Sequence, residues 1–166
     1  MNNYINTLLV KYNHPRPTKR RLSPYKATLI TFGATAQYTP DPDTSPLLDD
    51  PGIKRIQGIV GALLYYVRAI DNKLLHVLSK LGSKQAAATT STNEKITQLL
   101  DYCTTYPNDG ITYRASHMIL AAHSDAAYLN VSKAHSRVGT HIMCSKNYSV
   151  HAHNGPVLTI LHIIKF

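Results

Sequence analysis

Residues 123–143 read HSDAAYLNVSKAHSRVGTHIM. Small and apolar residues lead up to Asp125, a polar stretch follows at 130–137, and a second apolar run occupies 138–144. This pattern predicts an antiparallel hairpin with a polar turn, and it places Asp125 on the first strand. A carboxylate beside such a hairpin suits a hard cation such as Mg²⁺. Asp125 is therefore a candidate cation ligand.

The predicted hairpin extends into a larger sheet. A further apolar run follows it, and the turn signal Asn108-Asp109-Gly110 precedes it and leads into a short β run predicted at 111–114. Successive apolar runs joined by turns predict an antiparallel meander. The three runs of this meander are 118–128, 138–145 and 157–164.

The first two thirds of the chain show helical periodicity instead. Apolar residues recur at helical spacing on one face in each of four segments. Gly58 and Gly61 in the second segment lack side chains, which would let another element approach closely. The predicted helices are 4–12, a second that begins at 53 with an apolar stripe to 67, 72–81 and 92–106. Gly82 is the predicted C-cap of the third helix, and Ser91 or Thr92 is the predicted N-cap of the fourth.

Residues 20–50 are interpreted as a tether with one short strand predicted at 27–32. Four prolines at 40–51 argue against any regular element there. Four aspartates stand among these prolines, but the stretch lacks the glycine hinge of a calcium-binding loop. We interpret the acidic stretch as a solvated linker.

Charge is the strongest compositional signal. The chain of 166 residues carries 18 Lys and Arg against nine Asp and Glu, a net charge of +9. Such an excess favours phosphate backbones, with affinity that depends on salt and not on sequence. A solvated basic tail without a partner is the alternative. The basic segment, residues 11–26, precedes the first acidic residue and contains Lys11, Arg16, Lys19, Arg20, Arg21 and Lys26.

Composition also narrows the class of protein. Hydrophobic residues make up 43% of the chain, which favours a folded protein, and the length predicts one domain with room for a partial second. No apolar run reaches the roughly 18 residues of a membrane span, and no signal peptide is evident. We expect an intracellular protein of the cytoplasm or nucleus without a membrane partner. Cys103 and Cys144 lack a metal-binding spacing and are expected to be free, buried thiols.

Four motifs together resemble one protein family, the Pol polyproteins of copia-type retrotransposons. Residues 59–66, IVGALLYY, are similar to its Leu-Val-Gly-x-Leu-Leu-Tyr helix, and residues 99–102, LLDY, stand where it has an Arg-Tyr-Leu helix. Residues 4–9, YINTLL, resemble the helix that closes its reverse transcriptase thumb. Residues 124–126, SDA, resemble the strand that carries the first metal-binding aspartate of its ribonuclease H domain.

This resemblance implies a fold and a division of the chain. The fold class would be α+β, ending in a partial ribonuclease H-like antiparallel sheet of three strands. The parts would be a thumb-end helix and proline-rich tether at 1–52, a helical connection block at 53–107, and the partial ribonuclease H-like domain at 108–166. Two details depart from the family pattern: Ser136-Arg137 reverses its Arg-Ser step, and Tyr128 stands near its usual tryptophan.

The resemblance also implies a parent activity, which is RNA-directed DNA synthesis and Mg²⁺-dependent hydrolysis of RNA–DNA hybrids. Asp125 would be its catalytic metal ligand. Two-metal hydrolysis needs several carboxylates, whereas residues 126–166 contain no Asp or Glu. We expect a truncated, catalytically incomplete fragment that binds no Mg²⁺ stably. Its partners would be an RNA–DNA hybrid or other nucleic acid, bound weakly, and the missing polyprotein segments.

Two other functions stay open. The chain would be a small, non-catalytic nucleic-acid-binding module if the basic segment alone were functional. It would be an active hydrolase if another carboxylate set were used, and Asp125→Asn would then abolish Mg²⁺- or Mn²⁺-dependent cleavage. Seven of the nine histidines lie from His117 onward. Of these, His123 is expected on the same sheet face as Asp125, while His151 and His153 lack an evident third ligand.

Overall fold

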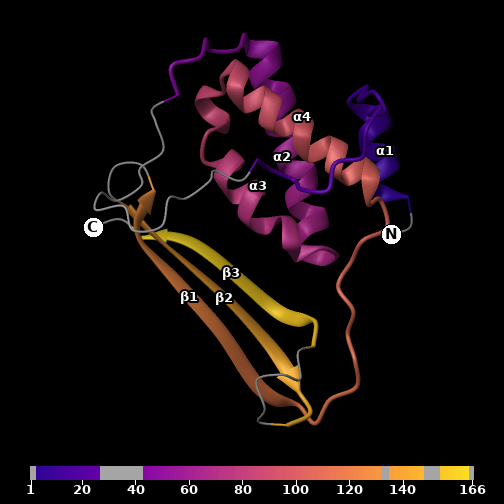
Figure 1. Cartoon of the computed structure of the whole chain (residues 1–166), viewed down its shortest axis with the longest axis vertical. Helices are drawn as coiled ribbons and strands as arrows, with labels where there is room; N and C mark the ends of the chain where they lie inside the picture. The colour runs from indigo at the N-terminus through magenta and orange to yellow at the C-terminus, as the bar shows by residue number, and fades with distance from the viewer. Residues whose placement is uncertain (1–2, 27–42, 132–134, 148–153, 165–166) are drawn as a thin grey trace. The chain divides into compact units, whose positions relative to one another are not determined.

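The computed structural model describes residues 3–26, 43–131, 135–147 and 154–164. These residues form two compact units (Figure 1). The helical unit contains the described residues up to 110, and the sheet unit contains those from 111 onward. The described part holds four α-helices and a three-stranded antiparallel sheet, so the α+β class is confirmed. The predicted division into three parts stays a prediction.

Helix α1 (Tyr4–Lys11) opens the helical unit. Its buried residues, Ile5, Leu8 and Leu9, lie at helical spacing, which confirms the predicted amphipathic face. Directly after α1, Tyr12 lies so close to Gly58 that a Cβ at Gly58 would be 2.6 Å from the Tyr12 hydroxyl oxygen. The predicted close approach is therefore confirmed at Gly58. It is not seen at Gly61, which is exposed and would have no atom of the described residues within 4 Å of a Cβ.

Helix α2 (Asp50–Ala69) begins three residues earlier than predicted. The Asp49 carboxylate accepts a hydrogen bond of 3.0 Å from the Gly52 backbone N–H, which caps the first turn. Pro51 lies in that first turn, where its missing N–H would have had no intrahelical partner. The prediction that the prolines through Pro51 form no regular element is thus wrong at its last member.

Two further α-helices complete the unit. The predicted helix at 72–81 is a 3₁₀ turn, η1 (Asn72–Leu74), followed by α3 (Leu75–Gly82), and Ser83 takes the C-cap position predicted for Gly82. After a short 3₁₀ turn, η2 (Gln85–Ala87), helix α4 (Thr90–Thr105) begins. Its N-cap is Thr89 and not Ser91 or Thr92, because the Thr89 hydroxyl is the one that accepts from the Thr92 N–H, at 3.2 Å.

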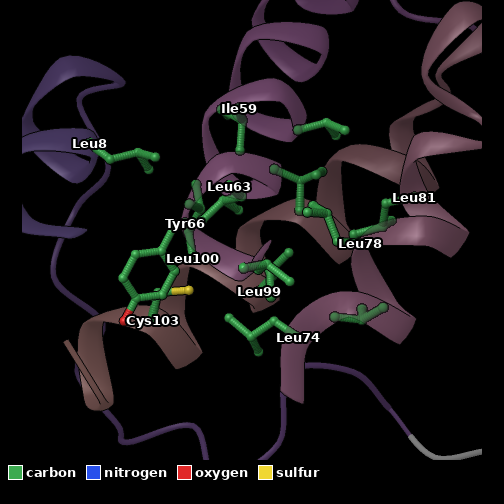
Figure 2. Packing of buried hydrophobic residues seen from close by; sticks show 14 of the residues in the cluster. Leu8, Ile59, Leu63, Tyr66, Leu74, Leu78, Leu81, Leu99, Leu100 and Cys103 are labelled. Atoms are coloured by element: carbon green, nitrogen blue, oxygen red, sulfur yellow. The ribbon is translucent and has the colours of Figure 1, made fainter. Parts of the chain in front are cut away.

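One hydrophobic core joins all four helices. Leu63 of α2, Leu99 and Leu100 of α4 and Leu78 of α3 are almost completely buried in it. Figure 2 shows these side chains converging with Tyr66 and Cys103 between the helices. Cys103 is a free, buried thiol as predicted, while Cys144 is free and half-buried. Burial raises the pKa of the Cys103 thiol to about 12, so it stays protonated at neutral pH.

The acidic stretch before α2 is held by hydrogen bonds to the start of α4. The Asp43 carboxylate accepts from the Ser45 hydroxyl at 2.5 Å and from the Thr89 hydroxyl at 2.8 Å. These bonds hold the pKa of Asp43 down at about 2. The Thr90 N–H also donates to the Pro46 carbonyl at 3.0 Å. Residues 43–49 are mostly exposed and irregular as predicted, but these bonds attach them to the start of α4, so they are not a free linker. The strand predicted at 27–32 lies outside the described residues.

The sheet unit is a meander of β1 (Ile119–Val131), β2 (His135–Ser145) and β3 (Pro156–Ile164), in the order β1-β2-β3. Both pairings are antiparallel, which confirms the predicted arrangement (Figure 1). The polar turn is shorter than the predicted 130–137, because Ser136 and Arg137 pair within β2. Within the described ranges, each helix is too short or too polar to span a lipid bilayer.

The β run predicted at 111–114 does not form a strand. A side chain instead replaces the strand partner: Asn154 accepts from the Arg114 N–H and donates to the Arg114 carbonyl, both at 2.7 Å. Asn154 also donates to the Cys144 carbonyl at 2.9 Å. A Cβ at Gly155 would lie 2.5 Å from Ile111 Cγ2, so the glycine permits this close packing.

Candidate functional site

The register of the sheet defines one face, here named the Asp125 face. Asp125 pairs with Gly139 of β2, which in turn pairs with Leu161 of β3. Residues two apart on a regular strand point to the same side. The Asp125 face therefore contains Ile119, Ala121, His123, Asp125 and Ala127 of β1, Arg137, Gly139, His141, Met143 and Ser145 of β2, and Thr159, Leu161 and Ile163 of β3.

Asp125 itself is exposed in the middle of β1. Its carboxylate has no hydrogen-bond or ion-pair partner among the described residues. The residue it pairs with, Gly139, has no side chain, and Leu161 Cδ1 would lie 3.5 Å from a Cβ at that position. Among the residues that the structure describes, this side chain caps no helix and pairs with no cation. Its exposure leaves the carboxylate oxygens accessible to a cation from solvent.

Two histidines flank Asp125 on this face. The register pairs His123 with His141, which confirms that His123 shares the face of Asp125. The ring of His141 is held from β3, because its Nδ1 lies 3.0 Å from the Thr159 hydroxyl. His141 was not among the candidate residues predicted from the sequence. The hairpin pattern was the available signal, and it predicted the pairing of the strands without specifying their register.

Arg137 adds a positive charge to the same face. It pairs with Ala127, the next residue of the Asp125 face along β1. Its side chain is buried, and Nη1 has no hydrogen-bond partner in the described ranges. This burial lowers the pKa of the Arg137 guanidinium from its ordinary value, because removal from water disfavours the charged form. The family resemblance marked residues 136–137 as a step into the second strand, and it gave no sign of a buried cation.

These residues do not make a complete two-metal centre. Such a centre holds two cations about 3.5–4 Å apart between several carboxylates. No group of three or more His, Cys, Asp or Glu side chains in the described part of the chain is arranged to hold a metal ion. Asp125 is one oxygen ligand, and the imidazoles beside it are poorer ligands for Mg²⁺. His151 and His153 lie outside the described residues.

The basic segment forms a second candidate site, on the helical unit. It is fixed to α4 and is not a detached tail. The nearly buried His14 ring places Nε2 2.8 Å from Asp101 Oδ1, and the Arg21 backbone N–H donates to the Thr105 hydroxyl at 3.1 Å. Further along, the Gln98 amide donates to the Ser23 carbonyl at 3.3 Å. No motif or spacing in the sequence predicts that His14 contacts Asp101.

The predicted nucleic-acid-binding residues keep their charges in solvent. All of these residues are exposed, but Arg21 differs from the others because its Nε lies 3.6 Å from Asp101 Oδ2. Lys11 also has a local contact, with Nζ 5.4 Å from the centre of the Tyr12 ring. The exposed basic residues are Lys11, Arg16, Lys19, Arg20, Arg21 and Lys26.

A third group of charges lies where α2, η1 and the end of α4 meet. Lys73 Nζ is 2.6 Å from Asp109 Oδ2 and 3.7 Å from Asp71 Oδ1, and Asp71 is only 1% exposed. Burial raises the pKa of Asp71, and the charge of Lys73 opposes that rise. Nearby, burial and the Asp71 charge raise the pKa of the Tyr66 hydroxyl to about 12. All of these residues belong to the helical unit, and the contact of Lys73 with Asp109 joins η1 to the segment that follows α4.

Comparison with protein-family models found no match, and comparisons with curated proteins and with solved structures found none either. The assignment of function therefore depends on the residues and their geometry.

Proposed function

We propose that this chain is a segment of a copia-type Pol polyprotein, and that its sheet supplies one metal-binding carboxylate, Asp125, to a ribonuclease H-like centre that it does not complete. The observation that carries this proposal is the state of Asp125. Within the described part of the chain it is an exposed carboxylate on a strand of small and apolar residues, with no structural partner. The three-stranded meander and the family motifs support the same proposal.

Under this proposal, hydrolysis of the RNA strand requires carboxylates from outside the sheet. The chain as it stands is expected to bind Mg²⁺ weakly, since a single carboxylate provides few of the oxygen ligands that Mg²⁺ requires. It is also expected not to cleave an RNA–DNA hybrid. The parent centre would hydrolyse the RNA strand only when further acidic ligands join Asp125.

The test starts from the transcript beyond the codon for Phe166. If the reading frame continues into an acidic helix, the extended chain should cleave an RNA–DNA hybrid with Mg²⁺ or Mn²⁺. Asp125→Asn should then lower that rate by at least about 100-fold, because it removes a metal ligand. The matched control is Glu94→Gln, which neutralises an exposed carboxylate of α4 and should leave the rate unchanged.

Two results would contradict this proposal. Cleavage by the 166-residue chain that disappears in Asp125→Asn would identify a complete hydrolase. Cleavage by the extended chain that persists in Asp125→Asn would remove Asp125 from the centre.

We propose a second function for the basic segment, non-specific binding to a phosphate backbone. The contacts of His14 and Arg21 with α4 support it, because they hold the segment in place while its charges stay exposed. A pre-ordered segment loses less conformational entropy on binding than a detached tail would. Binding of this kind releases counterions and therefore weakens steeply with salt.

The measurement is duplex affinity as a function of salt concentration. In Lys19→Ala/Arg20→Ala, the slope of log K against log[salt] should fall by about 2, because each cation that no longer neutralises a phosphate lowers it by about 1. Lys54→Ala removes an exposed charge of α2 outside the segment and should leave the slope unchanged. An equal fall in both variants would mean that overall charge, and not the segment, determines binding.

A further inference from the structure

The side chain of Asn154 joins three parts of the sheet unit. Its Oδ1 accepts hydrogen bonds from the Arg114 N–H at 2.7 Å and from the Gly155 N–H at 2.9 Å. Its Nδ2 donates to the Arg114 carbonyl at 2.7 Å and to the Cys144 carbonyl at 2.9 Å. A side-chain amide has two acceptor sites and two donor hydrogens, so every hydrogen-bonding position of Asn154 is used. We name this arrangement of Asn154, Arg114 and Cys144 the Asn154 clip.

The clip requires an amide at position 154. An ionised carboxylate accepts hydrogen bonds but donates none. It would place a negatively charged oxygen against the carbonyl oxygens of Arg114 and Cys144, to which Nδ2 now donates. Both carbonyls would lose their donor, and the charges of like sign would repel each other. Conversion of Asn154 to an acid would therefore break the clip.

The next residue has to be a glycine, because Gly155 is buried against the segment that the clip holds. A Cβ at Gly155 would lie 2.5 Å from Ile111 Cγ2 and 2.8 Å from the Thr112 carbonyl oxygen. The Thr112 oxygen is a backbone atom, so no side-chain rotation relieves that clash. The clip and the packing together therefore require an Asn-Gly pair, and residues 154–155 are the one such pair in the sequence of 166 residues.

An Asn-Gly pair is chemically labile, because glycine has no side chain to hinder its backbone nitrogen. In deamidation the Gly155 nitrogen attacks Cγ of Asn154, and the Cγ–Nδ2 bond breaks. The proton of the attacking N–H leaves with Nδ2 as ammonia, and a cyclic succinimide forms. Water then opens the ring at either carbonyl and leaves an aspartyl or an isoaspartyl residue. The net reaction consumes one water and releases one ammonia, so solvent supplies everything that it needs.

The clip holds this pair in an unreactive arrangement. The Gly155 N–H donates to Asn154 Oδ1, and a hydrogen-bond donor lies near the plane of the carbonyl group that accepts from it. Attack on Cγ has to come from above that plane. The bonds to Arg114 and Cys144 oppose the rotation of the amide that attack requires. Deamidation therefore requires the clip to open first, which is a local opening of the fold.

We propose that Asn154 is a site of spontaneous deamidation, and that conversion at this site irreversibly releases residues 111–114 from the sheet. While the clip is closed, the amide is protected from reaction. Once the clip has opened and the amide has reacted, the resulting carboxylate cannot close it again. The released residues belong to the segment between α4 and β1, which connects the two units in the chain. The proposal depends neither on the role of Asp125 nor on the basic segment.

Peptide mapping of the full chain by mass spectrometry tests the site. The chain is incubated at neutral pH, both folded and in urea, and the mass change from amide to acid at Asn154 is followed over time. Conversion should be at least about tenfold faster in urea, because reaction through a rare open state is slowed by the small population of that state. Absence of conversion in urea would overturn the site, and equal rates in both conditions would overturn its protection by the clip.

Hydrogen exchange tests the release. In the converted wild-type chain, residues 111–117 should exchange about tenfold faster or more than in the unconverted chain, because the carbonyls of the clip have lost their donor. Asn154→Asp should reproduce this increase without incubation. The matched control is Asn108→Asp, which makes the same change at an exposed asparagine near the segment and should leave its exchange unchanged.

Two results of the exchange experiment would overturn the release. One is exchange at 111–117 that stays at the unconverted level in either the converted chain or Asn154→Asp. The other is an equal increase in Asn108→Asp, which would mean that added negative charge near the segment, and not loss of the clip, causes the change.

Discussion

Leu63→Ala is expected to lower the free energy of unfolding of the helical unit by about 3–4 kcal/mol. Leu63 has no solvent exposure and lies in the middle of α2, where its side chain points into the core (Figure 2). Its truncation removes apolar burial and leaves a cavity in the core shared by the four helices, which cannot collapse fully. The loss would be a large fraction of the total stability of a domain of this size.

Urea unfolding followed by far-ultraviolet circular dichroism measures this effect. The control is Leu22→Ala, the same chemical change at a residue that is 75% exposed. It should alter the free energy of unfolding by less than about 0.5 kcal/mol. A loss below about 1 kcal/mol for Leu63→Ala would mean that the core shared by the four helices is not closely packed around Leu63.

Lys73→Met is expected to cost about 1–3 kcal/mol of stability at pH 7, after allowance for the half-exposed lysine side chain. The substitution keeps a long apolar side chain and removes the ammonium 3.7 Å from Asp71 Oδ1. Asp71 is then a buried carboxylate without a counter-charge. Asp109, which lies 2.6 Å from the same ammonium, also loses its partner.

The cost should depend on pH in a defined direction. The pKa of Asp71 is already raised in the folded protein, so between the ordinary value of 3.8 and that raised value the folded state binds more protons than the unfolded state. Stability from this group therefore falls as pH rises through that window. Without Lys73 the pKa rises further and the window extends upward. The difference between wild type and Lys73→Met should be smallest near pH 4 and reach its full size at neutral pH.

Parallel unfolding titrations of both proteins at several pH values measure this difference. Lys54→Met, which removes an exposed lysine of the same unit, is the control and should show no such trend. A pH-independent cost for Lys73→Met would indicate weakened side-chain packing and not an uncompensated charge at Asp71.

Local sequence patterns predicted the elements well, and they predicted element ends poorly. The apolar spacing of Ile56, Ile59 and Leu63 specifies a helix whose buried face needs no knowledge of its neighbours. The same is true of the apolar runs that define the three strands. The ends of helices depend on individual hydrogen bonds, and neighbouring residues of similar capping propensity compete to form them. Thr89 caps α4 in preference to Ser91 and Thr92 because its hydroxyl is the one that reaches an N–H of the first turn.

The candidate site around Asp125 was predicted in part. The sequence identified the carboxylate and one histidine on its strand, because residues two apart on a strand share a face. It did not identify His141 or Arg137, because the register of the hairpin was needed. An irregularity between Ala127 and Val131 shifts that register. The position of the polar stretch in the sequence does not predict this shift.

The amino-acid sequence by itself determined the α+β class, the amphipathic faces, the meander and the concentration of positive charge at 11–26. These properties follow from periodicity and composition, which act over a few neighbouring residues. Only the tertiary structure decided that the basic segment lies against α4 through His14 and Asp101, that Lys73 pairs with Asp109, and that Arg137 shares a face with Asp125. These contacts join residues distant in the chain or depend on the strand register, so their energies arise only when folding brings the partners together.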